Sequence, residues 1–283
     1  MAAESRGAAS ADEPRPATLA DWFRPPQLLR FARQQSLACL FAAGLFVGLA
    51  LSSAVPLPIA RYDALLLYGL ALTGLFWATR LETGAEALAV AGFHLVGLVF
   101  ELVKVHMGSW SYPGDALTKF GGVPLYSGFL YAAVGSYVCQ AWRRLDLEFA
   151  GYRTAATALV AAGIYANFLT HHWFPDLRVL LAAAMVAVTW GVTVRFTVGG
   201  VRYRMPLALS FVLIGFFLWV AENIATYLGA WEYPHQADVW HLVHPAKFGA
   251  WALLVTVACV IVATWKYSGR GRVSPAPRRP RER

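Results

Sequence analysis

Eight long apolar runs dominate this chain of 283 residues. A run of about 20 apolar residues can cross the hydrocarbon core of a bilayer as an α-helix, because lipid leaves the peptide groups no partner outside the helix itself. Only 14% of the residues are charged, whereas a soluble domain carries about 25%. We therefore predict an all-α polytopic transmembrane helix bundle of about eight spans, over residues 36–53, 63–79, 86–105, 123–142, 153–171, 178–198, 206–227 and 246–266.

Basic residues are concentrated in every second segment between the apolar runs. These segments are the N-terminal region, the loops near 80–85, 143–152 and 199–205, and the arginine-rich C-terminal region. Cytoplasmic loops of membrane proteins carry an excess of arginine and lysine. Both termini are thus expected in the cytoplasm, as an even number of spans also requires. The lipid bilayer is the expected partner of the basic C-terminal region, and nucleic acid is not an expected partner.

One sequence motif occurs twice, 121 residues apart and without a gap. It has the form E-x6-G-x-W-x-Y-P-x10-P-x3-G and begins at Glu101 and again at Glu222. Shifting the apolar runs by the same distance places the first four on the last four. Four is an even number, so the two halves should share one orientation and be related by an axis along the membrane normal. We divide the chain into a cytoplasmic tail (1–35), a first four-helix repeat (36–142), a second four-helix repeat (153–266) and a basic cytoplasmic tail (267–283).

The two glutamates of the motif are the candidate catalytic residues. Each lies about one turn inside the apolar boundary, where a carboxylate is costly. An interfacial turn explains the tryptophan, tyrosine, glycine and proline of the motif, but it does not require the carboxylates. Burial raises a carboxyl pKa and a nearby lysine lowers it, so Glu101 and Glu222 could divide acid and base roles. A structural alternative, in which each glutamate forms an ion pair or clamps two helices, explains the same pattern.

Further polar and aromatic residues gather at the predicted exterior ends of the spans. We expect them to line a pocket between the two halves. The histidines could instead bind metal, because His241 and His244 are spaced i,i+3 and the pair His171–His172 could add a ligand. The chain has no H-E-x-x-H motif, so we predict no metal site, and the cofactor is left unknown. The candidate binding residues are Lys104, Trp110, Tyr112, Asn167, His171, His172, Trp219, Asn223, Trp231, Tyr233, His241, His244 and Lys247.

Long segments of the chain resemble a known bacterial membrane-protein family, the domain of unknown function 817. The resemblance covers roughly residues 90–265 and implies a multi-pass protein of the bacterial inner membrane, with no particular activity. The segments that carry it are FELVKVHMGSWSYP, GGVPLYSGFLYAAVGSYVCQAWRR, YANFLTHHW and ENIATYLGAWEYP.

A shorter pattern is similar to membrane-embedded carotenoid hydratases and small-subunit lycopene cyclases. A glutamate near a span end, a glycine-aromatic turn and a Gly-Val-Pro helix start follow one another there, as they do here from Glu101 to Pro124. This similarity implies chemistry on isoprenoids. The cyclases often carry a carboxylate pair after the proline, whereas this chain has Leu125–Tyr126 and Ala246–Lys247.

These observations predict an integral membrane protein with an exterior-side intramembrane pocket. Acid–base chemistry on an isoprenoid or another lipid is the leading hypothesis, with a hydrophobic or isoprenoid substrate as the expected ligand. A membrane transporter for a small solute and a metal-dependent lipid hydrolase are the alternatives. The sequence leaves open whether the protein is an enzyme.

Overall fold

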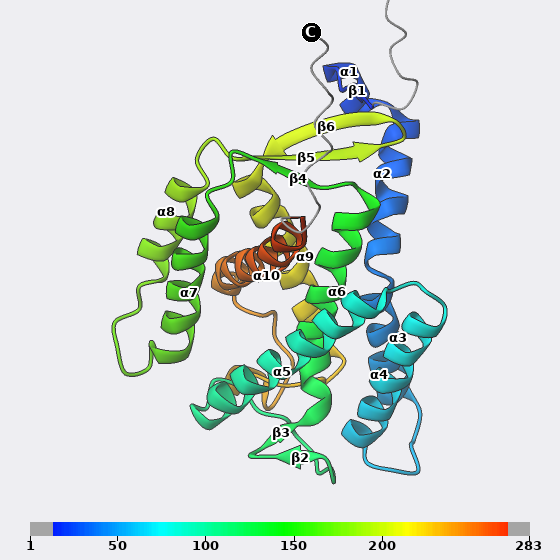
Figure 1. Cartoon of the computed structure of the whole chain (residues 1–283). Coiled ribbons are helices and arrows are strands. Elements are labelled where there is room, and N and C mark those ends of the chain that lie inside the picture. Colours follow the sequence, from blue (N-terminus) through cyan, green and yellow to red (C-terminus); the bar gives the residue numbers. More distant parts are fainter. Residues whose placement is uncertain (1–13, 271–283) are drawn as a thin grey trace, which may run out of the picture.

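The computed structural model describes residues 14–270, so the outer parts of both predicted tails, 1–13 and 271–283, lie outside the described residues. Helices make up most of this part of the chain (Figure 1). They are α1 (Leu19–Phe23), α2 (Pro25–Ala38), α3 (Leu40–Ala54), α4 (Arg61–Ala78), α5 (Gly84–His106), α6 (Gly128–Arg144), α7 (Thr154–Thr170), α8 (Arg178–Val188), α9 (Leu207–Tyr227) and α10 (Ala246–Arg270). The strands are β1 (Arg15–Pro16), β2 (Lys119–Phe120), β3 (Val123–Pro124), β4 (Glu148–Ala150), β5 (Thr193–Val198) and β6 (Val201–Pro206).

Helices α5, α6, α9 and α10 form the centre of the bundle, with the α7–α8 hairpin on one side and the α3–α4 hairpin on the other (Figure 1). Helix α5 packs along α6, and α9 packs along α10. The α3–α4 hairpin rests on α6, whereas the α7–α8 hairpin rests on α10. Each half of the chain therefore repeats the same order of packing, in which the first helix of the half contacts the last.

Three helices of the described region are long and apolar enough to cross a membrane, namely α5, α9 and α10. The pair α2 and α3 adds a fourth candidate if it counts as one span, with a bend of 61° at Cys39. The sequence predicted about eight, and by this test the count is lower because α7 and α8 are shorter apolar helices and α4 and α6 do not meet the test of length and hydropathy. Large apolar side chains such as Leu88 (75% exposed) and Phe217 (67%) nevertheless face outward along the bundle, as lipid contact requires. The chain is thus an all-α membrane bundle.

Two predicted boundaries are wrong. The sixth apolar run, 178–198, is helical only to Val188, and its second half forms β5 of a β-hairpin with β6. Gly199 and Gly200 close that hairpin with φ values of 54° and 75°, the backbone that a two-residue turn of this type needs. The fourth run, 123–142, becomes helical only at Gly128, because a short strand and a 3₁₀ turn precede it. The region 1–35 is also more than a tail, since α1 and most of α2 lie in it.

The motif glycine, seven residues after each motif glutamate, ends a helix. Gly108 after α5 and Gly229 after α9 have φ values of 67° and 66°. A backbone N–H one residue later bonds a carbonyl back in the helix in both places, Ser109 to Lys104 and Ala230 to Ala225, each at 2.9 Å. This left-handed helix ending favours glycine, which explains why the motif has it at this position.

The two copies of the motif meet each other directly. Ser111 and Glu232, which occupy the same motif position 121 residues apart, form an antiparallel bridge. The N–H of each donates to the carbonyl of the other, at 2.9 and 3.0 Å. Two equivalent residues that bond each other in this way are expected to lie on a twofold axis between the halves. The superposition of the whole halves stays a prediction.

Candidate functional site

The carboxyl of Glu101 is buried and fully engaged by hydrogen bonds. Its residue is 3% exposed. One oxygen accepts from Trp110 Nε1 and from the Tyr112 hydroxyl, both at 2.7 Å, and the other accepts from the Tyr131 hydroxyl at 2.9 Å. Burial and the neighbouring Glu101 raise the pKa of Tyr112 well above its usual value, so its hydroxyl stays a donor. The carboxyl joins α5 to the loop after it and to α6.

The second motif glutamate repeats this arrangement with different partners. Glu222 is 4% exposed. One of its oxygens accepts from the Tyr233 hydroxyl, and the other accepts from Trp251 Nε1 at 2.7 Å. Tyr233 lies at the motif position of Tyr112, whereas Trp251 of α10 is a partner that the motif did not reveal. Both glutamates therefore bind aromatic donors of their own half.

Motif aromatic residues from both halves form one buried cluster, which includes Trp110, Tyr112, Trp231 and Tyr233. The rings of Trp110 and Tyr233 meet edge to face, 6.0 Å apart, across the two halves. All four were predicted to line the pocket. Of these four residues, only Trp110 lines the cavity described next. The other three pack in the same buried cluster as Trp110.

A small cavity of about 80 Å³ lies between α5, α7, α8 and α10. Five predicted binding residues line it, and they come from segments far apart in the sequence. Its other walls are largely apolar, with Ile164, Leu181, Leu253 and Leu254 among them. Neither motif glutamate is among the lining residues. The predicted residues that line the cavity are Lys104, Trp110, Asn167, His171 and Lys247.

Lys104 is the most buried cation of this cavity, with 2% of the residue exposed. Its ammonium nitrogen lies 3.4 Å from His171 Nδ1 and 4.2 Å from the centre of the Phe168 ring. No carboxylate of the described residues lies within 4.0 Å of it. A buried charge normally has an opposite charge beside it. The Lys104 amine lacks such a partner within this distance.

Lys247 brings a second ammonium group to the cavity from the start of α10. Its Nζ lies 4.6 Å from the ring centre of Tyr233 and 5.4 Å from that of Trp110. Aromatic faces attract cations at such distances, and this holds the amine over the cluster. Within residues 14–270 it too has no carboxylate partner at salt-bridge distance.

Arg178 is a lining residue that the sequence reasoning did not include. It opens α8 and forms a salt bridge with Asp176, with Nε 2.9 Å from one carboxylate oxygen and 2.7 Å from the other. The Arg178 guanidinium lowers the pKa of Asp176 to about 2, so that carboxylate is ionised at neutral pH. The proximity of Arg178 and Asp176 to the histidine pair 171–172 was the available signal.

Asn167 lines the cavity with an acceptor that has no partner. It is 6% exposed, and its Nδ2 donates to the carbonyl of Pro175 at 3.0 Å. Its Oδ1 is buried without any hydrogen bond. An orphaned buried acceptor is rare and costly, so a donor from a bound molecule would stabilise this site.

The remaining predicted binding residues support loops. Asn223 accepts a hydrogen bond from the N–H of Val243 at 2.9 Å, and Trp219 Nε1 donates to the carbonyl of Val243 at 3.1 Å. His244 Nδ1 accepts from the N–H of Ala246 at 3.2 Å. The carbonyl of His241 accepts from a glutamine side chain, and the exposed His172 lies 3.4 Å from Ser109 Oγ.

No metal-binding group is found among the residues that the structure describes, when three or more His, Cys, Asp or Glu side chains are required. His241 and His244 are exposed. Partial desolvation and the neighbouring His171 and Lys104 lower the pKa of His172. The arrangement therefore presents cations to a cavity.

Residues 27–259 match the family described as protein of unknown function DUF817. The chain belongs to the DUF817 family. A similar curated protein is the uncharacterized protein YoaT of Bacillus subtilis (strain 168), which is 51% identical over 244 residues, covering 85% of this chain and 92% of YoaT.

Two solved structures resemble this DUF817 chain in fold. One is a mycobacterial Insig homologue, MvINS from Mycobacterium vanbaalenii, with a TM-score of 0.45 and 19% identity, covering 64% of this chain and 93% of that one. The other is a cross-linked trimer of MvINS, with a TM-score of 0.46 and 20% identity, covering 69% and 98%.

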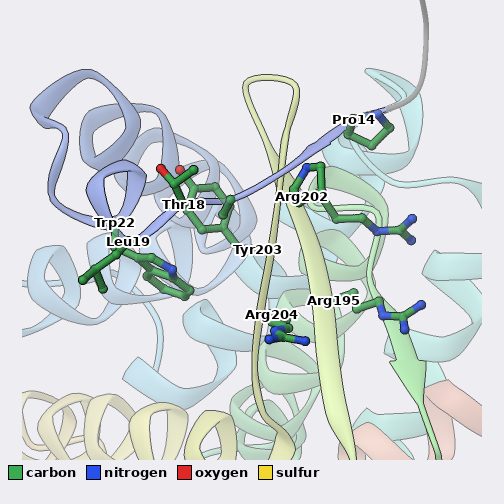
Figure 2. Close-up of a pocket in the computed structure, with 10 residues that line it drawn as sticks. Pro14, Thr18, Leu19, Trp22, Arg195, Arg202, Tyr203 and Arg204 are labelled. Carbon is green, nitrogen blue, oxygen red and sulfur yellow. The ribbon is translucent and has the colours of Figure 1, made fainter. Parts of the chain in front are cut away.

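A larger groove of about 540 Å³ lies at the opposite end of the bundle and partly outside the DUF817 match. Figure 2 shows Arg195, Arg202 and Arg204 on its hairpin side, with Trp22 and Leu19 across from them. Arg195 and Arg202 both pair with Glu148. None of the predicted site residues lines this groove, and its arginines are at least one-third exposed, unlike Lys104.

Proposed function

We propose that this DUF817 protein binds an amphiphilic anion, a lipid with a negatively charged head group, in the cavity between α5, α7, α8 and α10. The observation that carries the proposal is Lys104, a cation that is 2% exposed and lines the cavity without a carboxylate partner. A desolvated ammonium group is costly unless an anion compensates it. A bound anionic head group supplies that compensation.

The surroundings of Lys104 support an amphiphile over a simple ion. Lys247 and Arg178 add positive charge at the same cavity. Ile164, Leu181 and Leu253 form an apolar wall beside them, continuous with a buried cluster between α7, α8 and α10. A molecule with a charged head and a hydrocarbon tail matches both surfaces. The unpartnered Asn167 Oδ1 would accept a hydrogen bond from a hydroxyl of such a ligand or from a water bound with it.

The contacts of the two motif glutamates favour the structural alternative for them. Each carboxylate accepts hydrogen bonds from aromatic donors, and neither lines the cavity. Acid–base chemistry by Glu101 and Glu222 stays a prediction. The transporter and the metal-dependent hydrolase also stay predictions, without a specific contact in their favour. We place the cavity at the exterior side, on the arginine distribution alone.

Native mass spectrometry of the protein purified in dodecyl maltoside tests the proposal. We expect the wild type to carry the added mass of an anionic lipid and Lys104→Met to lose it. Lys119→Met is the matched control, because Lys119 donates to the carbonyls of Tyr112 and Gly114 outside the cavity. Wild-type protein without a bound lipid anion, or full retention in Lys104→Met, would contradict the proposal. Lys247→Met provides the same test if Lys104→Met does not accumulate.

A further inference from the structure

We infer that the head group taken by this cavity is a dianionic phosphate monoester, as found in a lipid phosphate, and not a carboxylate or a phosphodiester. This inference rests on the proposed function and concerns the same site. Its three supports are the balance of charge at the cavity, the arrangement of the cations around it, and the absence of each lysine from the equivalent position of the other half.

Counted over the lining residues and Asp176, the charge at the cavity is two positive units in excess. The Glu222 carboxyl, which interacts electrostatically with Lys247, does not line the cavity and is held by Tyr233 and Trp251. Lys104, Lys247 and Arg178 each contribute one positive charge, and the adjacent Asp176 removes one by its salt bridge with Arg178. A carboxylate or a phosphodiester carries one negative charge and would leave one of the two lysines uncompensated. A phosphate monoester carries about −1.5 to −2 charges near neutral pH, so it balances the site.

The cations reach the cavity from three different helices. Lys104 is on α5, Arg178 begins α8, and Lys247 is in the first turn of α10. A phosphate monoester has three terminal oxygens that point in different directions, whereas a carboxylate has two in one plane. The cavity of about 80 Å³ is several times the volume of about 10–15 Å³ that one water needs on the same measure. It therefore has room for a compact head group.

The two lysines are not part of the repeated scaffold. The residue 121 positions after Lys104 is Ala225, and the residue 121 positions before Lys247 is Tyr126. At these equivalent positions Ala225 and Tyr126 are both buried in the aromatic cluster, and the Tyr126 hydroxyl donates to the carbonyl of Ala230 at 3.3 Å. Each of the two positions thus packs without a lysine in the other half. The repeated helix packing therefore requires neither Lys104 nor Lys247, and each lysine serves the cavity instead.

Titration of the purified protein with short-chain lipids tests the inference by isothermal calorimetry. The probes are dihexanoylphosphatidic acid, a monoester; dihexanoylphosphatidylglycerol, a diester; octanoate, a carboxylate; and inorganic phosphate. We expect the monoester to bind about tenfold or more tightly than the diester and octanoate, because one more charge is compensated. Inorganic phosphate should bind about tenfold or more weakly than the monoester, since it has no hydrocarbon to bury.

Three variants link the preference to the residues. Lys104→Met and Lys247→Met should each weaken binding of the monoester by about tenfold or more and reduce its advantage over the diester. Asp176→Asn should strengthen it by about two- to fivefold, because the site gains positive charge. Lys119→Met should leave all four affinities unchanged.

The outcomes distinguish a failure of the phosphate monoester from a failure of the proposed function. Equal or tighter binding of the diester or octanoate would overturn the phosphate monoester and leave the proposed function standing. Absence of binding by every amphiphilic probe would overturn the proposed function as well. Inorganic phosphate as tight as the phosphatidic acid would overturn the lipid part of both. Weaker monoester binding by Asp176→Asn would overturn the charge balance on which the inference rests.

Discussion

Replacing Glu101 separates a structural clamp from a chemical group. Its carboxylate accepts three hydrogen bonds, from Trp110, Tyr112 and Tyr131. A hydrogen bond to a charged group stabilises a protein by about 1.5–3 kcal/mol, and an unsatisfied buried donor costs about 1–3 kcal/mol. Glu101→Leu leaves two buried donors and the partly buried Tyr131 hydroxyl without an acceptor, while it also removes the cost of burying a charge. We expect it to lower the free energy of unfolding by about 3–5 kcal/mol.

Glu101→Gln should cost much less, about 1 kcal/mol. Its amide oxygen can still accept from Trp110 and Tyr112, and the Tyr131 hydroxyl can rotate to accept from the amide nitrogen. A glutamine variant with normal stability therefore keeps the clamp without the charge. A catalytic carboxyl would behave differently, because the same variant would fold normally and lose activity.

Reversible unfolding in dodecyl maltoside, followed by tryptophan fluorescence, measures both changes. Glu222→Leu provides an internal comparison, because Glu222 accepts from two side-chain donors, and it should lose less stability than Glu101→Leu. The clamp is refuted if Glu101→Leu lies within about 1 kcal/mol of the wild type. It is also refuted if the glutamine and leucine variants lose stability equally.

Three further predictions use other contacts. The Arg61 guanidinium donates to two carbonyls just after α9, at 2.7 and 2.8 Å; Arg61→Met should lower the free energy of unfolding by about 2–3 kcal/mol, and an unchanged unfolding midpoint would contradict this. A Cβ on Gly128 would lie 2.6 Å from the backbone oxygen of His94, so Gly128→Ala should force α5 and α6 apart and cost about 1–3 kcal/mol. Gly92→Ala, where a Cβ meets nothing within 4 Å, is its control, and equal unfolding midpoints for the two variants would refute the clash. Burial raises the pKa of Glu82 above its unfolded value, so the wild type should lose stability relative to Glu82→Gln as pH rises through the raised pKa; a stability difference that is the same at pH 4 and pH 8, compared by thermal unfolding, would count against it.

Much of the bundle could be predicted because its signals are local. The apolar runs mark helices, and the motif glycines mark helix ends. The sequence also placed Lys104, Asn167, His171 and Lys247 in one site, and the structure brings them to one cavity. They share the same end of the bundle, so alternation of the spans was enough to gather them.

Other features depend on contacts that no local pattern encodes. Tyr131 binds Glu101, but the residue 121 positions later is Ala252, so the repeat does not reveal it. Strand β5 lies within the predicted sixth span, 178–198, because its residues are apolar on average, whereas β6 lies in the loop predicted near 199–205. The alternation in Thr193–Val198 is the strand signal. Arg178 stands at the start of the predicted sixth span, where no local pattern marks it as a site residue, and it lines the cavity with the two lysines only in the folded chain.

The bridge between Ser111 and Glu232 has a consequence for either half of the chain on its own. Each partner of the bridge is the other's counterpart in the repeat, so the contact is isologous, like the interface of a symmetric homodimer. A fragment that contains one half would expose an edge complementary to the same edge of a second copy. Two copies of a first-half fragment should pair through residues 108–113, and two copies of a second-half fragment should pair through residues 229–234. In the intact chain the two edges are covalently joined, so this pairing takes place within one molecule.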